Sequence, residues 1–263
     1  MSNKALILTG FALLILGVIP EAAVGQHSWT YQYTGVSESL NDVTFADSLN
    51  GWAVGFSGAI VHTTDGGTTW ESQNDSITHT LTGAHSVNTD ECWAVGADEI
   101  IIHTDDGGES WEIRHQGEGF SAGYLQDITF VDPDTGWAVG SGQLILYTTD
   151  GGETWTEQNS SISGGLEAID FADSQHLWAV GEIMDGGSTS GLALRTSDGG
   201  ATWEQLDTGL EEALYDVSFI DRDHGWAVGN SGTVAYTENG GDTWAEQQSA
   251  VDNTLYAVDF INR

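Results

Sequence analysis

Two short phrases alternate five times along this chain, and their regular return constrains the fold more than any other sequence feature. The first phrase is WAVG, which begins at Trp52, Trp93, Trp137, Trp178 and Trp226. The second has the form T-x-D/N-G-G-x-S/T-W and ends at Trp70, Trp111, Trp155, Trp203 and Trp244. A unit of about 41 residues that returns in register predicts a repeat architecture.

Each unit has the pattern of four short β-strands. In the first unit, residues 40–46, 51–55, 59–64 and 69–73 are rich in β-forming residues and are separated by Gly, Asp, Asn and Ser turns. Four strands in about 41 residues are typical of one blade, so the sequence predicts an all-β fold, a β-propeller of four-stranded blades. The repeats are expected at residues 39–79, 80–123, 124–164, 165–212 and 213–253, with a partial repeat at 254–263.

Parts of a further, closing blade are expected at the two ends. Trp29 precedes Trp52 by the spacing that separates Trp70 from Trp93, which predicts an outer strand. The final segment LYAVDFINR repeats the inner-strand phrase LYDVSFIDR, which predicts an inner strand. Five full blades and these parts predict a ring of six or seven blades when complete.

The second phrase is expected to be structural in all five copies. Its acidic or amide side chain can accept backbone N–H bonds across a tight turn, and its two glycines can adopt positive φ. Its tryptophan can bury about 200 Å² between neighbouring blades. The predicted structural residues are Asp65, Asp106, Asp150, Asp198, Asn239, Trp70, Trp111, Trp155, Trp203 and Trp244.

The N-terminal segment has the features of a targeting sequence. Lys4 precedes a mostly apolar run, and the small residues Ala23 and Gly25 offer a cleavage site. The run is short for a membrane-spanning helix, which needs about 20 residues. We therefore expect a cleaved signal peptide at residues 1–25 and a propeller at 26–263. The mature chain is expected to be extracellular, periplasmic or at the cell surface, without membrane insertion.

Charge narrows the range of partners. The formal net charge is −35, and loss of residues 1–25 removes one acid with the only lysine. Such a surface repels nucleic acid and anionic lipid. It favours a halophilic, salt-adapted protein, because concentrated salt shortens the Debye length to about 3 Å at 1 M. The single cysteine, Cys92, is expected to be a small core residue.

The second phrase resembles the Asp-box of sialidases and of BNR-repeat propellers. Together with F-x-D-x-x-x-G-W-A-V-G, it makes the chain similar to the photosystem II assembly and stability factor family and its non-photosynthetic bacterial relatives, over residues 26–263. The resemblance implies a seven-bladed exported propeller that acts as a protein-binding assembly factor. It also implies an arginine-rich partner-binding patch in the photosynthetic members. Only four arginines follow residue 25, which argues against a photosystem role.

Enzymatic chemistry is the competing interpretation. A sialidase needs three arginines on one substrate carboxylate, but Arg114, Arg195 and Arg222 occupy three different repeat positions. Other glycosidases need only two carboxylates, so a glycoside hydrolase is the alternative. The inner-strand acids that could reach a channel are Asp42, Asp127, Asp170, Asp216 and Asp259, although their recurrence favours a structural role. No catalytic residue, metal ligand or cofactor is predicted.

Two acidic segments resemble fragments of a calcium loop, at residues 132–136 and 221–225. They align with ADSLNG in the first repeat and are therefore expected to be first-hairpin turns, with calcium kept as a possible partner.

Two insertions in the regular repeat identify a candidate binding surface, because insertions elaborate a scaffold. They lie at residues 182–191 and 116–123 and are expected on the face opposite the Asp-box turns. Neutral loop drift is the alternative explanation. The expected contact residues are Phe120, Tyr124, Glu182, Ile183, Met184 and Asp185. The sequence thus predicts an exported, non-catalytic propeller scaffold that binds a protein or a glycan.

Overall fold

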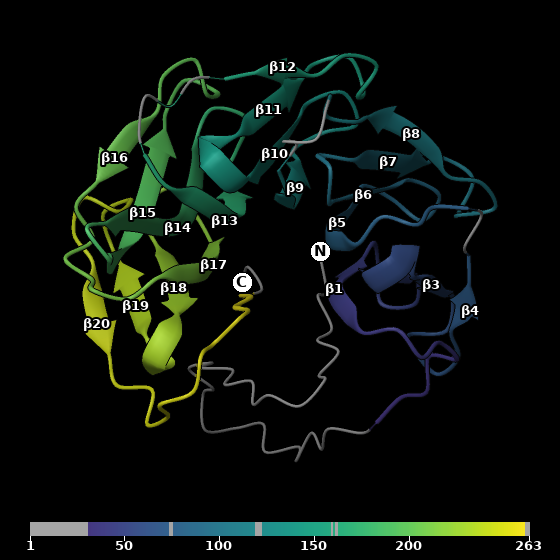
Figure 1. Ribbon diagram of the computed structural model, residues 1–263, viewed down its shortest axis with the longest axis horizontal. Coiled ribbons are helices and arrows are strands. Elements are labelled where there is room, and N and C mark those ends of the chain that lie inside the picture. Colours follow the sequence, from purple (N-terminus) through teal and green to yellow (C-terminus); the bar gives the residue numbers. More distant parts are fainter. Residues whose placement is uncertain (1–30, 74–75, 119–122, 159, 161–162, 261–263) are drawn as a thin grey trace.

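The computed structural model describes residues 31–73, 76–118, 123–158, 160 and 163–260. Five four-stranded antiparallel sheets follow one another around a central opening, with the first strand of each sheet nearest the centre (Figure 1). This arrangement is the predicted β-propeller. The expected leader, Trp29 and Phe120 lie outside the described residues.

Within each blade the four strands are neighbours in chain order. Blade 1 comprises β1 (Leu40–Phe45), β2 (Gly51–Gly55), β3 (Ile60–Thr63) and β4 (Glu71–Ser72), and blade 2 comprises β5 (Leu81–Ser86), β6 (Cys92–Gly96), β7 (Ile101–Thr104) and β8 (Glu112–His115). Blade 3 comprises β9 (Leu125–Phe130), β10 (Gly136–Gly140), β11 (Ile145–Thr148) and β12 (Thr156–Glu157). Blade 4 comprises β13 (Gly165–Phe171), β14 (Leu177–Asp185), β15 (Ser188–Thr196) and β16 (Glu204–Leu206). Blade 5 comprises β17 (Leu214–Phe219), β18 (Gly225–Gly229), β19 (Val234–Thr237) and β20 (Ala245–Gln247).

The two faces of the ring carry different connections. Short 3-10 turns follow the second strand in blades 1, 3 and 5, namely η1 (Phe56–Gly58), η2 (Ser141–Gln143) and η3 (Asn230–Gly232). They lie toward the viewer in Figure 1, on what we call the loop face, together with the connections from one blade to the next. The Asp-box turns and the turns between first and second strands form the opposite, box face.

The fourth strand of blade 1 is shorter than the sequence predicts. It covers Glu71–Ser72, whereas residues 69–73 were expected to be extended. The backbone N–H of Thr69 donates to the carboxylate of Asp65 at 2.8 Å, so the box turn takes a donor that a longer strand would use. The turn therefore ends only where strand pairing with β3 begins.

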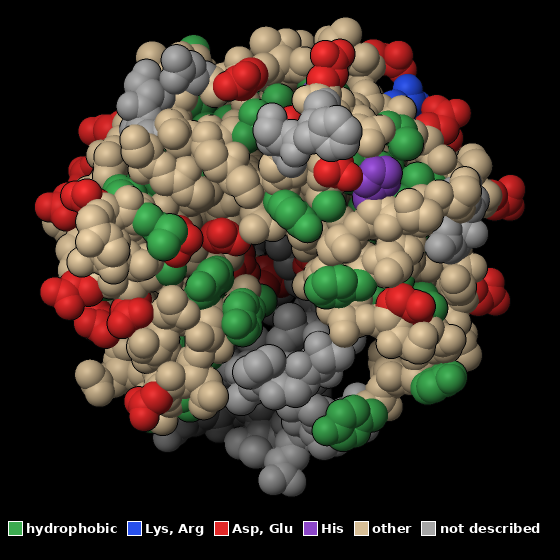
Figure 2. Space-filling model, viewed as in Figure 1, with side chains coloured by type: hydrophobic (Ala, Val, Ile, Leu, Met, Phe, Trp, Pro, Cys, Tyr) green, Lys and Arg blue, Asp and Glu red, His purple; other side chains and the backbone are tan. Residues whose placement is uncertain are grey.

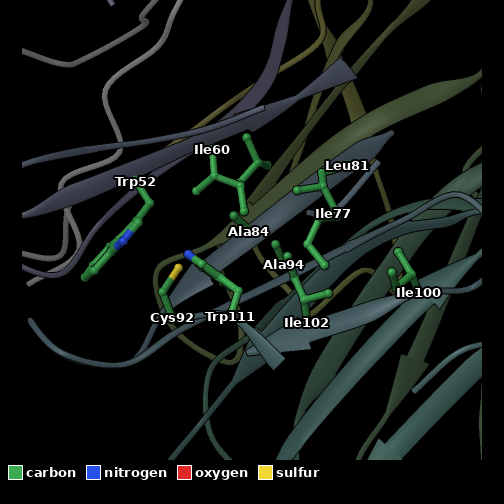
Figure 3. Packing of buried hydrophobic residues seen from close by; sticks show 11 residues of the cluster. Trp52, Ile60, Ile77, Leu81, Ala84, Cys92, Ala94, Ile100, Ile102 and Trp111 are labelled. Atoms are coloured by element: carbon green, nitrogen blue, oxygen red, sulfur yellow. The ribbon is translucent and has the colours of Figure 1, made fainter. Parts of the chain in front are cut away.

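The hydrophobic core lies between blades. The WAVG tryptophans of the first four blades are at most 1% exposed. Trp52 of blade 1 belongs to a cluster with Leu81, Cys92 and Trp111 of blade 2, and Cys92 lies within this cluster, as expected (Figure 3). Each blade therefore buries its apolar face only against its neighbour.

Side chains also fasten the inner strands to one another. Asp127 on β9 accepts the N–H of Ile128 at 2.8 Å and the N–H of Ile169, on the next blade's β13, at 2.9 Å. Asp42 and Asp216 make the same pair of bonds in blades 1 and 5. These inner-strand acids, which could have been channel carboxylates, thus satisfy backbone donors at the edges of neighbouring sheets.

The segment after blade 5 occupies the position of a further inner strand. The N–H of Val258 donates to Asp216 at 2.7 Å, as the inner strands of blades 2 and 4 do to their preceding blades. Phe260 stacks on Trp226 with ring centroids 4.1 Å apart. At the other end, Gln32 accepts a bond from Trp70 Nε1, the role that Gln158 has toward Trp203.

Blade 4 differs from the others in the length of its central hairpin. The insertion predicted as a loop continues the ladder instead, with β14 and β15 paired from Leu177↔Thr196 to Asp185↔Ser188. Gly186 and Gly187 close the hairpin at φ 58° and 92°. Two glycines with positive φ form the tight turn typical of β-hairpins, so the added residues lengthen the strands.

Candidate functional site

The Asp-box closes the turn between the third and fourth strands. In blade 2, Asp106 accepts the N–H and the hydroxyl of Ser110 at 2.9 and 2.7 Å, and the hydroxyl of Thr104 at 2.8 Å. The bonds from Ser110 lead in lowering the pKa of Asp106 to about 2. In the last copy, Asn239 keeps the bond from the Thr243 N–H at 3.0 Å. The boxes are therefore turn-forming elements with no carboxylate oriented toward a ligand.

We expect Asp106→Ala to lower the free energy of unfolding by about 1 kcal/mol at pH 7, since the lost bonds are solvent-exposed. Asp106→Asn should cost less, because Asn239 shows that an amide can close the turn. The folded-state pKa lies below the ordinary value of 3.8, so this stabilisation is present above about pH 4 and disappears as pH falls toward 2. Urea unfolding at pH 7 and pH 2.5 measures both effects. Equal losses for the two variants would contradict this account, and Asp105→Ala is the neutral control.

The box tryptophans are not equally buried. Trp111 and Trp203 are buried, and the other three are half-buried. Trp155 of blade 3 meets Trp93 of blade 2 edge to face, with centroids 6.1 Å apart. This residue therefore packs between blades, as the motif predicts.

All three described arginines form ion pairs that link blades. Arg114 of blade 2 pairs with Glu153 of blade 3 at 2.8 Å. Arg195 of blade 4 pairs with Asp242 of blade 5 at 2.8 Å, and Arg222 of blade 5 pairs with Asp173 of blade 4 at 2.7 Å. They do not converge, so the arginine triad of a sialidase is not assembled within the described residues.

The two segments that resemble calcium loops are first-hairpin turns. Asp132 accepts the N–H groups of Asp134 and Thr135, and Asp221 accepts those of Asp223 and His224, all at 2.8–2.9 Å. Asp47 closes the corresponding turn in blade 1. Across the described part of the chain, no group of three His, Cys, Asp or Glu residues is placed to hold a metal ion.

The structure places most predicted contact residues on the loop face. Tyr124, just before β9, is 46% exposed, and Met184, near the tip of the long hairpin, is 72% exposed. Asp185 is exposed and Glu182 half-buried. Ile183 packs against the core and lines a groove with Leu206 and Leu210 below the hairpin, so it is not a free contact residue.

Sequence reasoning missed two exposed aromatic residues of this face. Phe56 begins η1 and is 50% exposed, and Tyr256, in the segment after blade 5, is 57% exposed. Figure 2 shows hydrophobic side chains around the central opening. The signal for Tyr256 was present, because it repeats Tyr215 one repeat earlier. Phe56 replaces Ser141 and Asn230 at the start of equivalent turns, which was the signal there.

A β-bulge in every inner strand shapes the channel mouth. The register shifts at one residue in each first strand, and the bulged residues are Asn41, Thr82, Gln126, Glu167 and Tyr215. Bulges re-aim side chains. Thus Asn41 and Thr82 donate to backbone carbonyls of the next inner strand, while Gln126 Nε2 donates to Glu167 Oε2 at 3.1 Å. The bulged side chains therefore reach from blade to blade around the mouth.

Glu167 has the most perturbed carboxyl group at the mouth. Burial, aided by the nearby Glu182, raises the pKa of Glu167 to about 7. Tyr215 lies close enough that, after burial, Glu182 and Glu167 further raise its pKa. A carboxyl with a raised pKa beside a second carboxyl meets one requirement of a glycosidase, but exposed apolar residues occupy the same face.

Two peptide-independent findings set the molecule in context. The described part of the chain contains no helix long and apolar enough to span a membrane. No significant match was found among curated protein sequences.

Several solved propellers are similar in structure. One titled "YCF48 bound to D1 peptide" is 24% identical with a TM-score of 0.63 over 81% of this chain and 67% of its own. YCF48 from Cyanidioschyzon merolae is 19% identical with a TM-score of 0.53 over 86% of this chain and 90% of its own. The GH74 enzyme of Niastella koreensis is 18% identical with a TM-score of 0.62, over 78% of this chain and 37% of its own. At these identities the likeness shows a shared fold.

The family is shown by the sequence. The family model described as photosynthesis system II assembly factor YCF48 matches residues 21–117, 121–209 and 200–263, which include all five WAVG and Asp-box pairs. Repeat, blade geometry and sequence match agree, and this chain therefore belongs to the photosynthesis system II assembly factor YCF48 family.

Proposed function

We propose that this protein is an exported, salt-adapted, non-catalytic scaffold that binds an extended protein segment on its loop face. The observation that carries the proposal is the exposure of four large apolar side chains on that face, at 46–72%. They are Phe56, Tyr124, Met184 and Tyr256, and each comes from a different part of the ring. Exposed apolar side chains that gather on one face are typical of interaction sites.

Family membership supports the same proposal. A similar solved structure carries a peptide in its title, and the family is named for an assembly factor. The described arginines link blades here, so partner binding in this chain rests on the apolar side chains. The glycoside hydrolase alternative gains little from the GH74 propeller, since 18% identity shows the fold alone.

The test is selection of binding peptides from a random phage-displayed library on the purified chain in molar salt. We expect the double variant Tyr124→Ala/Met184→Ala to weaken the selected peptides at least tenfold, about 1.4 kcal/mol, through loss of exposed anchor residues. Leu49→Ala is the matched control, because Leu49 is equally exposed, at 52%, but lies in a first-hairpin turn on the box face.

Binding equally weakened by Leu49→Ala would contradict the assignment to the loop face. Hydrolysis of aryl glycosides or xyloglucan that is lost in Glu167→Gln would contradict a non-catalytic role and favour the glycoside hydrolase.

A further inference from the structure

The loop face combines apolar exposure with charge of one sign. Acidic side chains lie near the central opening in Figure 2, and no Lys or Arg is seen there. Arg195 and Arg222 make their ion pairs near the box face, and Arg114 lies on the outer strand β8. A segment that docks on this face therefore meets uncompensated negative charge.

The mouth of the channel concentrates this charge on one blade. Glu167 on β13 is half-buried, and its printed hydrogen bond comes from the neutral amide of Gln126 on β9. The other groups that act on it are Glu182 from β14 and Tyr215 from β17. None of these can neutralise the carboxylate.

Aromatic rings lie beside the carboxylates. Tyr215 and Tyr256 occupy the same position on successive inner strands, with ring centroids 5.3 Å apart and planes inclined at 40°. Aromatic faces and carboxylates both attract ammonium and guanidinium groups, and a partly desolvated setting strengthens each attraction.

We propose that the segment bound on the loop face carries a lysine or arginine whose charged group enters the channel mouth and pairs with Glu167 and Glu182, beside Tyr215. This inference rests on the proposed function, and it specifies the partner as a basic, apolar peptide. The apolar side chains of that peptide contact Phe56, Tyr124, Met184 and Tyr256.

Protonation provides an independent readout. A bound cation favours ionised Glu167, whose pKa in the free protein is about 7, so binding releases a proton. Affinity should therefore rise about tenfold between pH 6 and pH 8, and this dependence should disappear in Glu167→Gln. The glutamine preserves an acceptor for Gln126, so the fold should be retained.

The experiment uses the peptides selected on the full chain, each made with its Lys or Arg and with a neutral replacement, norleucine or citrulline. Titration calorimetry should show at least tenfold loss on neutralisation with the wild-type protein and less than twofold loss with Glu167→Gln/Glu182→Gln. The matched control is Glu71→Gln/Glu157→Gln, which removes the same charge from exposed outer strands.

The outcomes separate the two proposals. Selected peptides that need Tyr124 and Met184 but lack Lys and Arg would overturn the inference and leave the proposed function intact. An equal loss of affinity in Glu71→Gln/Glu157→Gln would assign the preference to the overall field and would also overturn it. Peptides indifferent to Tyr124 and Met184 would overturn the proposed function itself.

Discussion

Replacement of Trp178 by alanine should lower the free energy of unfolding by about 3–5 kcal/mol, the largest single effect expected in this molecule. The indole is 1% exposed and stacks on Phe219 of blade 5, with centroids 3.7 Å apart and planes inclined at only 8°. Its Nε1–H donates to the carbonyl of Gly240, also in blade 5, at 2.9 Å. The substitution therefore creates a cavity and removes a buried hydrogen bond at one interface between blades.

Urea unfolding followed by tryptophan fluorescence and circular dichroism in molar salt measures this loss. Trp226→Ala is the matched control, because Trp226 holds the same repeat position and stacks on Phe260 but is only half-buried. About half the loss is expected there. If both variants lost the same stability, the contact with blade 5 would not be the cause.

Asp127→Ala should cost about 2–4 kcal/mol, because two backbone donors lose their shared acceptor. One is the N–H of Ile128 on the same strand, and the other is the N–H of Ile169 on the next blade. Asp127→Asn should be intermediate, since the amide oxygen can accept one of the two bonds while its NH₂ group opposes the other donor.

The change is measured by urea unfolding beside Asp134→Ala, an exposed acid of the same blade, for which we expect a change within about 0.5 kcal/mol. Hydrogen exchange adds a local readout, because the Ile169 amide should lose protection before the rest of β13. Unchanged protection at Ile169 would show that the bond to Asp127 contributes little.

The repeat made the fold predictable. Trp52 and its equivalents identified the second strands, and the box tryptophans identified the turns before the fourth strands. Strand ends were less predictable, because a donor such as Thr69 can serve either a turn or a ladder, and only the geometry decides. The insertion in blade 4 was found by its length, but its Gly-Gly pair fits both a loop and a hairpin turn.

The candidate site was only partly predictable. Tyr124 and Met184 were found because insertions disrupt the repeat, whereas Tyr256 was overlooked because it follows the repeat. The importance of Glu167 depends on a bulge and on Glu182 across the ladder, and neither appears in a one-dimensional pattern. Conversely, the regular inner-strand acids proved to be engaged with neighbouring blades.

The Asp residues that join inner strands also define the evolutionary unit of this propeller. Asp42, Asp127 and Asp216 occur only in blades 1, 3 and 5, whereas blades 2 and 4 have Gly83 and Ala168 at that position. A Cβ on Gly83 would lie 2.6 Å from the carbonyl oxygen of Gln126, so no Asp fits there. Odd and even blades are thus complementary, and gene duplication in two-blade modules preserves this pairing, whereas gain or loss of a single blade breaks it.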